Sequence, residues 1–228
     1  MRKLILLLLA TYTIMANTLP QPITTTITTI QGNIITLATT LPEGRSGIVV
    51  HNYGNGLSAI THSVISNRDG TATLLPYRAI LHPNIPTIKT EAKIDDKVIL
   101  GGFYKNALVI APDARIYQKI IRSFNKRWIH PDAYALEFMK EEHLSLSLDS
   151  LQKFARANQV GLVLIASKNR LLILDPISQK IIDTKAMNLN TERAMRPFFS
   201  RFEQMDVSLF GWSDKELKDY YIAIEELK

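Results

Sequence analysis

The sequence contains no cysteine among its 228 residues, so the fold has neither a disulfide nor a thiolate that could bind a metal or attack a substrate. A chain of this length buries a hydrophobic core without such cross-links. No histidine has a second histidine or a carboxylate at the spacing of a metal site. The histidines lie far apart, at His51, His62, His82, His130 and His143. We therefore predict no metal-binding residue, and we expect His51 and His62 on strand faces.

The common catalytic motifs are also absent. The sequence has neither a G-x-S-x-G nucleophile elbow nor a G-K-[ST] phosphate loop. Its carboxylate pairs lie in polar stretches, and neighbouring side chains on a helix or strand point in different directions, so they make poor acid and base partners. These pairs are Asp95-Asp96, Glu141-Glu142 and Glu225-Glu226. We predict a protein that is not an enzyme, with no catalytic residue and no cofactor.

Long apolar runs are confined to the N-terminus. Arg2 and Lys3 precede the apolar run Leu4–Ala10, and Ala16 offers a small residue for cleavage, which predicts a secretory signal peptide over residues 1–16. The alternative is a membrane anchor, but the run is shorter than the ~18 residues that a spanning helix needs. We expect an exported protein, in the periplasm or at the cell surface, with no membrane-spanning segment after signal removal.

The charge of the chain is only mildly basic. Loss of Arg2 and Lys3 with the signal lowers the basic count from 27 to 25 against 21 acidic residues, and the formal charge from +6 to +4. Binding of nucleic acid by a whole domain usually requires a more concentrated positive charge. We therefore predict no nucleic-acid partner.

Residues 17–112 have the pattern of β-structure. Isoleucine and threonine fill residues 23–40 on both sides of Gln31-Gly32-Asn33, which is typical of a hairpin, and Asp69-Gly70 separates two alternating runs. No helical pattern follows Gly54-Asn55-Gly56, so we interpret it as a turn and not as a phosphate loop. Six or seven short strands predict a small antiparallel β-barrel or sandwich. The prolines of 83–93 predict a connecting loop.

Residues 113–228 predict an α+β domain. Asp113 is a natural N-cap for a helix over 114–125, and helical spacing continues over 131–142 and 148–158. Three short apolar runs that start near 161, 170 and 180 predict a three-stranded antiparallel meander with the helices packed on one of its faces. A capping box at Ser213-Asp214-Lys215-Glu216 predicts a last helix.

Two clusters of cations and aromatic residues have both a structural and a functional interpretation. Arg122, Lys126 and Arg127 beside Trp128 could grip a nucleic-acid backbone, but cations at the end of a helix also complement its dipole, and we favour that structural role. The second cluster is Arg196-Pro197-Phe198-Phe199-Ser200-Arg201-Phe202.

Pro197 disfavours a central strand, so we predict that this second cluster is an extended segment at an edge of the C-terminal sheet. Alternation then directs Phe198 and Phe202 to one side and Phe199 to the other. Burial of two phenylalanines contributes about 3 to 6 kcal/mol, which is enough to explain them as packing. The alternative is a peptide-docking edge.

Four segments carry a family resemblance. "EGRSGIVVH" at 43–51, "NALVIAPDARIYQKI" at 106–120, "VGLVLIASKNRLLIL" at 160–174 and "RPFFSRFEQMD" at 196–206 resemble, in that order, the N-terminal domain of the bacterial plasminogen-binding protein A family. The resemblance implies an exported or surface-exposed protein that captures host plasminogen through lysine-binding kringles. Such kringles recognise an ammonium and a carboxylate over an aromatic trough, and a C-terminal lysine supplies both charges. It therefore implies Lys228 as the ligand-binding residue.

The sequence departs from the family pattern after this domain. The family implies a long tail rich in lysine and glutamate, and this sequence stops where such a tail would begin. We therefore keep an alternative function, a periplasmic or envelope scaffold or assembly factor that docks a bacterial envelope protein and binds no plasminogen. Lys215 and Lys218, near Asp214 and Asp219, could imitate a terminal lysine, although ordinary ion pairing on a helix surface explains them equally well.

Overall fold

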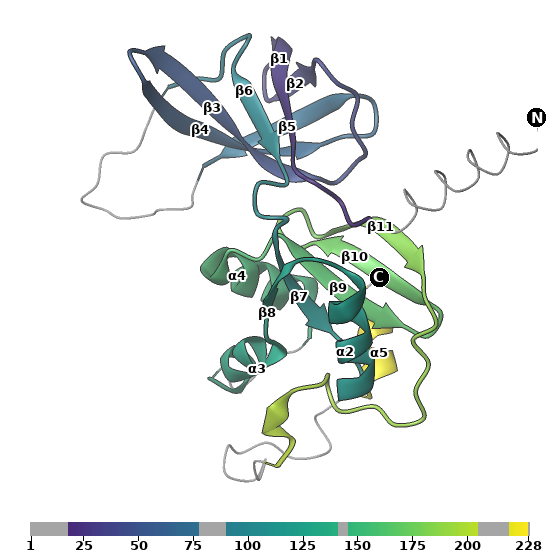
Figure 1. Cartoon of the computed structure of the whole chain (residues 1–228). Helices are drawn as coiled ribbons and strands as arrows, with labels where there is room; N and C mark the ends of the chain where they lie inside the picture. The colour runs from purple at the N-terminus through teal and green to yellow at the C-terminus, as the bar shows by residue number, and fades with distance from the viewer. Residues whose placement is uncertain (1–17, 78–89, 141–145, 205–218, 228) are drawn as a thin grey trace, which may run out of the picture.

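The computed structural model describes residues 18–77, 90–140, 146–204 and 219–227 (Figure 1). Several predicted features lie outside these residues: the signal peptide over 1–16, residues 83–89 of the connecting loop, the pair Glu141-Glu142, the capping box at 213–216 and Lys228. Within the described residues, no helix has the length and the apolar content that a bilayer-spanning helix requires.

Six strands of the first half form a closed antiparallel barrel in the order β1-β2-β5-β4-β3-β6. The strands are β1 (Ile23–Gln31), β2 (Ile34–Leu37), β3 (Ser46–Gly54), β4 (Leu57–Ser66), β5 (Thr71–Pro76) and β6 (Lys97–Leu100). The predicted small barrel is confirmed. Of the two predicted forms it is the barrel and not the sandwich, because β1 pairs with both β2 and β6 and so closes the sheet.

The predicted turns connect the barrel strands. Gly32, between β1 and β2, has φ +61°, and Gly70, before β5, has φ +81°. Glycine adopts this left-handed conformation without steric strain, which explains its place in both turns. Gly54, Asn55 and Gly56 form the turn between β3 and β4, as expected. Alternate side chains of the strands fill the barrel interior, among them Ile27, Ile35, Val49, Val64, Ala72 and Val98.

A second, five-stranded sheet lies below the barrel in Figure 1, in the order β11-β10-β9-β7-β8. Its strands are β7 (Asn106–Ile110), β8 (Arg127–Ile129), β9 (Leu162–Ser167), β10 (Arg170–Asp175) and β11 (Lys180–Ala186). The predicted antiparallel meander is present as β9-β10-β11. The sheet is wider than predicted, because β7 joins it in parallel to both β8 and β9.

Strand β7 lies in the second sheet and not in the barrel-like part where we expected it. We predicted 17–112 as the barrel-like part, whereas the barrel strands end at Leu100 and β7 lies in the second sheet. The reason is visible in its burial: every residue from Ala107 to Ile110 is buried. A run that is apolar without alternation is typical of a parallel strand covered on both faces, not of a barrel strand.

The helices cover both faces of the second sheet, so the prediction of a single helical face is wrong. On one face lies α2 (Ala114–Ser123); its Ile116, Tyr117 and Ile120 pack in the same cluster as Val109 and Leu164. On the other face lie α3 (Pro131–Lys140), α4 (Leu148–Asn158) and α5 (Tyr220–Glu225).

The strand order explains the two helical layers. The chain passes from β7 to β8 through α2, and then returns across β7 to β9 through α3 and α4. Parallel crossovers are right-handed, so two crossovers in opposite directions place their helices on opposite faces. Two predicted helix starts are present: Asp113 accepts a hydrogen bond from Ile116 N at 2.7 Å, and Ser147 caps α4.

Candidate functional site

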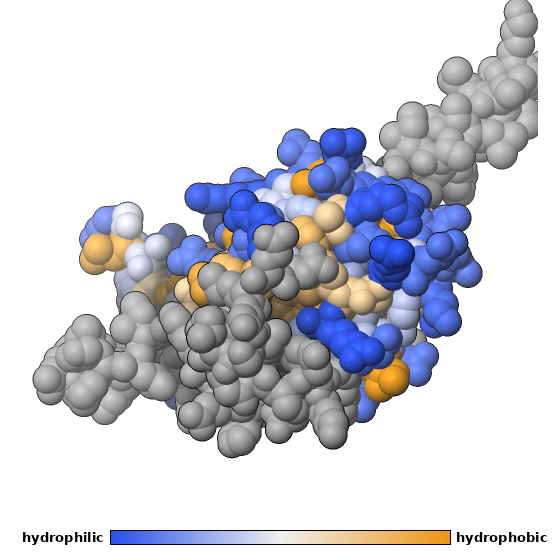
Figure 2. Space-filling model, turned by 90° about the horizontal axis from the view of Figure 1, so that it is seen from below, coloured by the Kyte–Doolittle hydropathy of each residue, from blue (hydrophilic) through white to orange (hydrophobic). Residues whose placement is uncertain are grey.

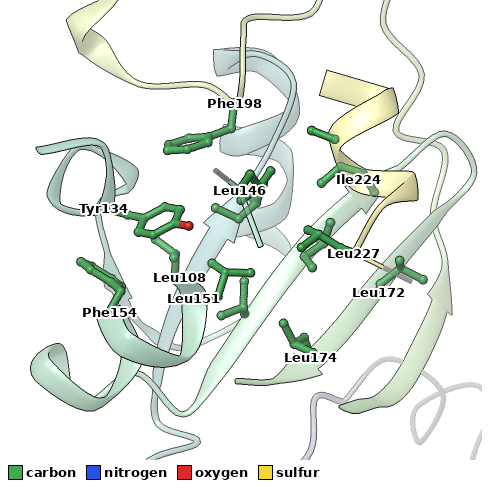
Figure 3. Close-up of a cluster of buried hydrophobic side chains, with 14 of the residues drawn as sticks. Leu108, Tyr134, Leu146, Leu151, Phe154, Leu172, Leu174, Phe198, Ile224 and Leu227 are labelled. Carbon is green, nitrogen blue, oxygen red and sulfur yellow. The ribbon is translucent and has the colours of Figure 1, made fainter. Parts of the chain in front are cut away.

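The predicted ligand-binding residue Lys228 lies outside the described residues, and so do Lys215 and Lys218. The residues directly before Lys228 are described. Leu227 is buried with Ile224 in the core cluster under α5 (Figure 3). The segment that leads to Lys228 is therefore anchored to the second sheet.

Polar side chains of the described residues gather at three places, which we call the Asp175 joint, the His51 pair and the Asp132 cluster. Within the part of the chain that the structure describes, no three histidine, aspartate or glutamate side chains lie close enough together to hold a metal ion. No sequence motif predicted any of the three places, because each place joins residues that lie far apart in the chain.

The Asp175 joint connects the barrel to the second sheet. Asp175 ends β10 and is 0% exposed. Its Oδ2 accepts hydrogen bonds from Ser46 N at 2.8 Å, from Ser46 Oγ at 2.7 Å and from the Tyr104 hydroxyl at 2.7 Å. Its Oδ1 accepts from Ile177 N at 3.0 Å and Ser178 N at 3.1 Å. Since Ser46 begins β3, this carboxylate links the two parts of the fold.

The chemistry of the Asp175 joint is that of a structural connection. Burial, together with the nearby charge of Asp175, raises the pKa of the Tyr104 phenol far above its ordinary value, so the hydroxyl remains a donor. Further contacts lie beside it: Ser178 Oγ donates to Gly44 O, and Lys180 Nζ lies 2.6 Å from Glu43 Oε1. The hydrogen bond and charge of Lys180 lower the pKa of the Glu43 carboxyl.

The His51 pair lies in the barrel. His51 Nδ1 is 2.6 Å from Asp96 Oδ1, and Asp96 Oδ2 accepts from Lys93 N at 2.8 Å. We expected Asp96 in a polar surface context, which is wrong, because it is only 6% exposed. The pairing of β3 with β6 brings the two residues together, since Val50 pairs with Lys97. Only knowledge of this strand pairing could have predicted the contact.

The Asp132 cluster joins the start of α3 to the segment after β11. Asp132 accepts hydrogen bonds from Arg201 N at 2.8 Å and from Arg201 Nε at 2.6 Å, and His130 Nδ1 lies 3.1 Å from its Oδ1. Burial opposes ionisation of Asp132. The hydrogen bonds from Arg201 and the charges of His130 and Arg201 outweigh it and hold the pKa of the carboxyl below its ordinary value.

The segment Arg196–Phe202 crosses the end of a central strand, so its predicted place at a sheet edge is wrong. Met195 N donates to Pro112 O and Phe199 N donates to Ala111 O, each at 2.7 Å, just beyond β7. The segment forms no strand, and a 3-10 helix, η1, follows at Arg201–Gln204.

The predicted alternation of its phenylalanines is nevertheless present. Phe198 is buried and stacks on Tyr134 at 5.2 Å between ring centres (Figure 3), and Phe202 packs against the same cluster. Phe199 packs on the opposite side, 5.4 Å from the ring of Tyr117. These three rings therefore belong to the packing of the fold, which disfavours a peptide-docking role.

The basic end of α2 has no exposed aromatic partner among the described residues. Trp128 packs against the core cluster beneath α2. Lys126 Nζ donates to Tyr104 O at 2.8 Å and to Pro20 O at 3.4 Å, and burial lowers the pKa of its ammonium. These contacts favour the structural interpretation of Lys126 and Trp128.

The fold defines an α+β protein in which a small closed barrel is joined to a mixed sheet through buried polar groups. The chain belongs to the family described as "Plasminogen-binding protein pgbA N-terminal", whose sequence model matches residues 22–227. Two relatives named plasminogen-binding protein PgbA come from Helicobacter pylori, strains J99 and 26695.

These two relatives are distant and longer. They are 26% and 25% identical to this chain over 200 residues, which cover 82% of this chain and 42% of each relative. The chain thus matches less than half the length of the curated relatives. No solved structure matches the chain.

Proposed function

We propose that this protein is exported and binds host plasminogen through the lysine-recognising kringle domains of plasminogen. The observation that carries the proposal is the family match over residues 22–227, which includes the barrel and the second sheet together. The two relatives named plasminogen-binding protein PgbA support it. The basic and apolar N-terminal pattern over residues 1–16 supports export.

The proposed contact is a lysine, with Lys228 as the first candidate. A kringle binds a cation and a carboxylate held a lysine's length apart, and a terminal lysine carries both groups on one residue. The preceding Leu227 is buried against the core with Ile224. Because one residue spans at most about 3.6 Å, the proposal places the kringle close to the end of α5.

The test is binding of purified residues 17–228 to immobilised plasminogen, with and without a free lysine analogue. We expect saturable binding that the analogue abolishes. The variant Lys228→Ala should bind at least about tenfold more weakly, a loss of about 1.4 kcal/mol. The matched control is Lys97→Ala, because Lys97 is exposed on barrel strand β6. Binding that ignores the analogue contradicts the proposal.

The envelope-scaffold alternative gives the opposite result in the same assay. It predicts no plasminogen binding by the chain and a stoichiometric bacterial partner in a pull-down from envelope extracts. If Lys228→Ala keeps full affinity while the lysine analogue still competes, then another lysine of the chain carries the contact.

A further inference from the structure

The outer face of α2 carries a row of cations. Arg115, Lys119 and Arg122 are exposed and stand at positions i, i+4 and i+7, so they follow one line along the helix. The opposite face of α2 is buried through Ile116 and Ile120. At a rise of 1.5 Å per residue the row spans about 10 Å.

Among the residues that the structure describes, the row has no acidic partner. The sequence from 114 to 131 contains basic residues and no aspartate or glutamate. In the structure, Arg115 Nη2 donates to Asn190 O and Lys119 Nζ donates to Asn188 O, each at 2.7 Å. The ion pairs formed among the described residues involve other cations, namely Arg68, Lys180, Lys185, Arg201 and two histidines. Carbonyl oxygens orient a cation without neutralising it, so the row keeps its net positive charge.

An open depression continues the row. It has a volume of about 610 Å³ and is lined by Arg115, Asn190, Thr191, Glu192 and Arg193. Arg193 adds a fourth cation beside Arg115. The Thr191 hydroxyl donates to Arg193 O and the Asn190 amide donates one hydrogen to Asn169 Oδ1, which leaves the second amide hydrogen of Asn190 as a neutral donor. Among the described residues, Glu192 lies in the lining, and the Asp113 carboxylate accepts from Ile116 N as the N-cap of α2. Cations therefore outnumber acids on this surface, which we call the α2 cationic face.

We propose that the α2 cationic face binds a linear anionic polysaccharide that carries sulfate or carboxylate groups. A row of point charges about 10 Å long matches a polymer with repeated charges better than a single small anion. Release of the counterions that surround such a polymer drives its binding to exposed cations, so no deep pocket is required. This inference does not depend on plasminogen binding.

The surroundings of the row argue against two other polyanionic partners. A helix that inserts into a lipid surface needs exposed apolar side chains, and a groove for single-stranded nucleic acid needs exposed aromatic rings. No large exposed hydrophobic residue lies between Phe103 and Leu136. Figure 2 shows the molecule from below, with hydrophilic side chains bordering a smaller apolar area of the described surface.

The test uses heparin as the probe and two triple variants with equal loss of charge. The row variant replaces all three cations with glutamine, which has a good helix propensity: Arg115→Gln, Lys119→Gln and Arg122→Gln. The control is Lys93→Gln, Lys97→Gln, Arg156→Gln, whose residues are exposed on the barrel and on α4, away from α2. Affinity is measured by titration at several sodium chloride concentrations, with circular dichroism and plasminogen binding measured on each variant.

We expect the wild type and the control to bind heparin similarly, and the row variant to bind at least about tenfold more weakly. The slope of log affinity against log salt should fall in magnitude by about one for each cation removed. The proposal is overturned if both triple variants lose heparin affinity equally, or if the wild type shows no saturable heparin binding. Tighter binding to phosphatidylglycerol vesicles or to single-stranded DNA, lost with the same row, also overturns it. Unchanged plasminogen binding in the row variant keeps the two functions distinguishable.

Discussion

Individual polar side chains of this protein act mainly between segments that are distant in sequence. Asp132 is an example: it holds both the backbone N–H and the guanidinium of Arg201, which lies beyond β11. The contact lowers the pKa of the Asp132 carboxyl. A carboxyl whose folded pKa is depressed stabilises the fold above its unfolded pKa, and that contribution is lost as the pH falls through the folded pKa.

The first prediction concerns this contact. Arg201→Gln should lower the free energy of unfolding by about 1 kcal/mol at neutral pH, since the Arg201 side chain is largely exposed. The difference from the wild type should shrink below about pH 4, where the unfolded carboxyl is protonated, and should vanish once the folded carboxyl is protonated as well. Urea unfolding at several pH values between neutral and acidic measures this difference in unfolding free energy, and Arg196→Gln, at an exposed arginine, is the control. A difference that stays constant with pH would show that Asp132 is not the partner that matters.

Helices and strands could be predicted wherever their signals are local. The N-cap Asp113, the turn glycines Gly32 and Gly70 and the apolar spacing of α4 all fix elements through residues a few positions apart. Strand β7 could not be assigned to its sheet, because its uninterrupted burial depends on two parallel partners, β8 and β9, and β9 follows only after α2, β8, α3 and α4. The Asp175 joint and the His51 pair could not be predicted for the same reason, since both depend on which strands become neighbours.

The second prediction concerns the segment that crosses the end of β7. Phe198→Ala should lower the free energy of unfolding by about 3 to 5 kcal/mol, because it removes a buried ring that stacks on Tyr134. Phe199 is only half-buried, so Phe199→Ala is the matched control and should cost less. Denaturant midpoints of the two variants measure the difference. Equal or smaller loss for Phe198→Ala would show that this segment is not part of the core that α3 and α5 share.

The whole molecule combines two sheets that share few secondary-structure contacts, yet the junction between them is tightly hydrogen-bonded. The segment from Glu43 to Ser46 enters the barrel at β3 and lies against the turn from Asp175 to Lys180. A Cβ on Gly44 would lie 2.9 Å from the Cβ of Lys180, which shows how closely the two segments approach. A joint built from buried hydrogen bonds at close backbone contact favours cooperative unfolding of the barrel and the second sheet.

The third prediction is that Asp175→Asn uncouples the two parts. Both carboxylate oxygens of Asp175 accept from donors, so the amide nitrogen of asparagine would face a donor in either orientation. We expect a loss of about 3 kcal/mol or more, because buried donors are left without acceptors. Trp128 packs against the core cluster of the second sheet, so its fluorescence, measured in a Trp212→Phe background, reports the second part, while amide hydrogen exchange of β1 to β6 reports the barrel. In the wild type the two signals should report one transition, and in the variant they should separate. The exposed Asp95→Asn should leave them coincident. Coincident transitions in Asp175→Asn would show that packing alone, without this carboxylate, holds the two sheets together.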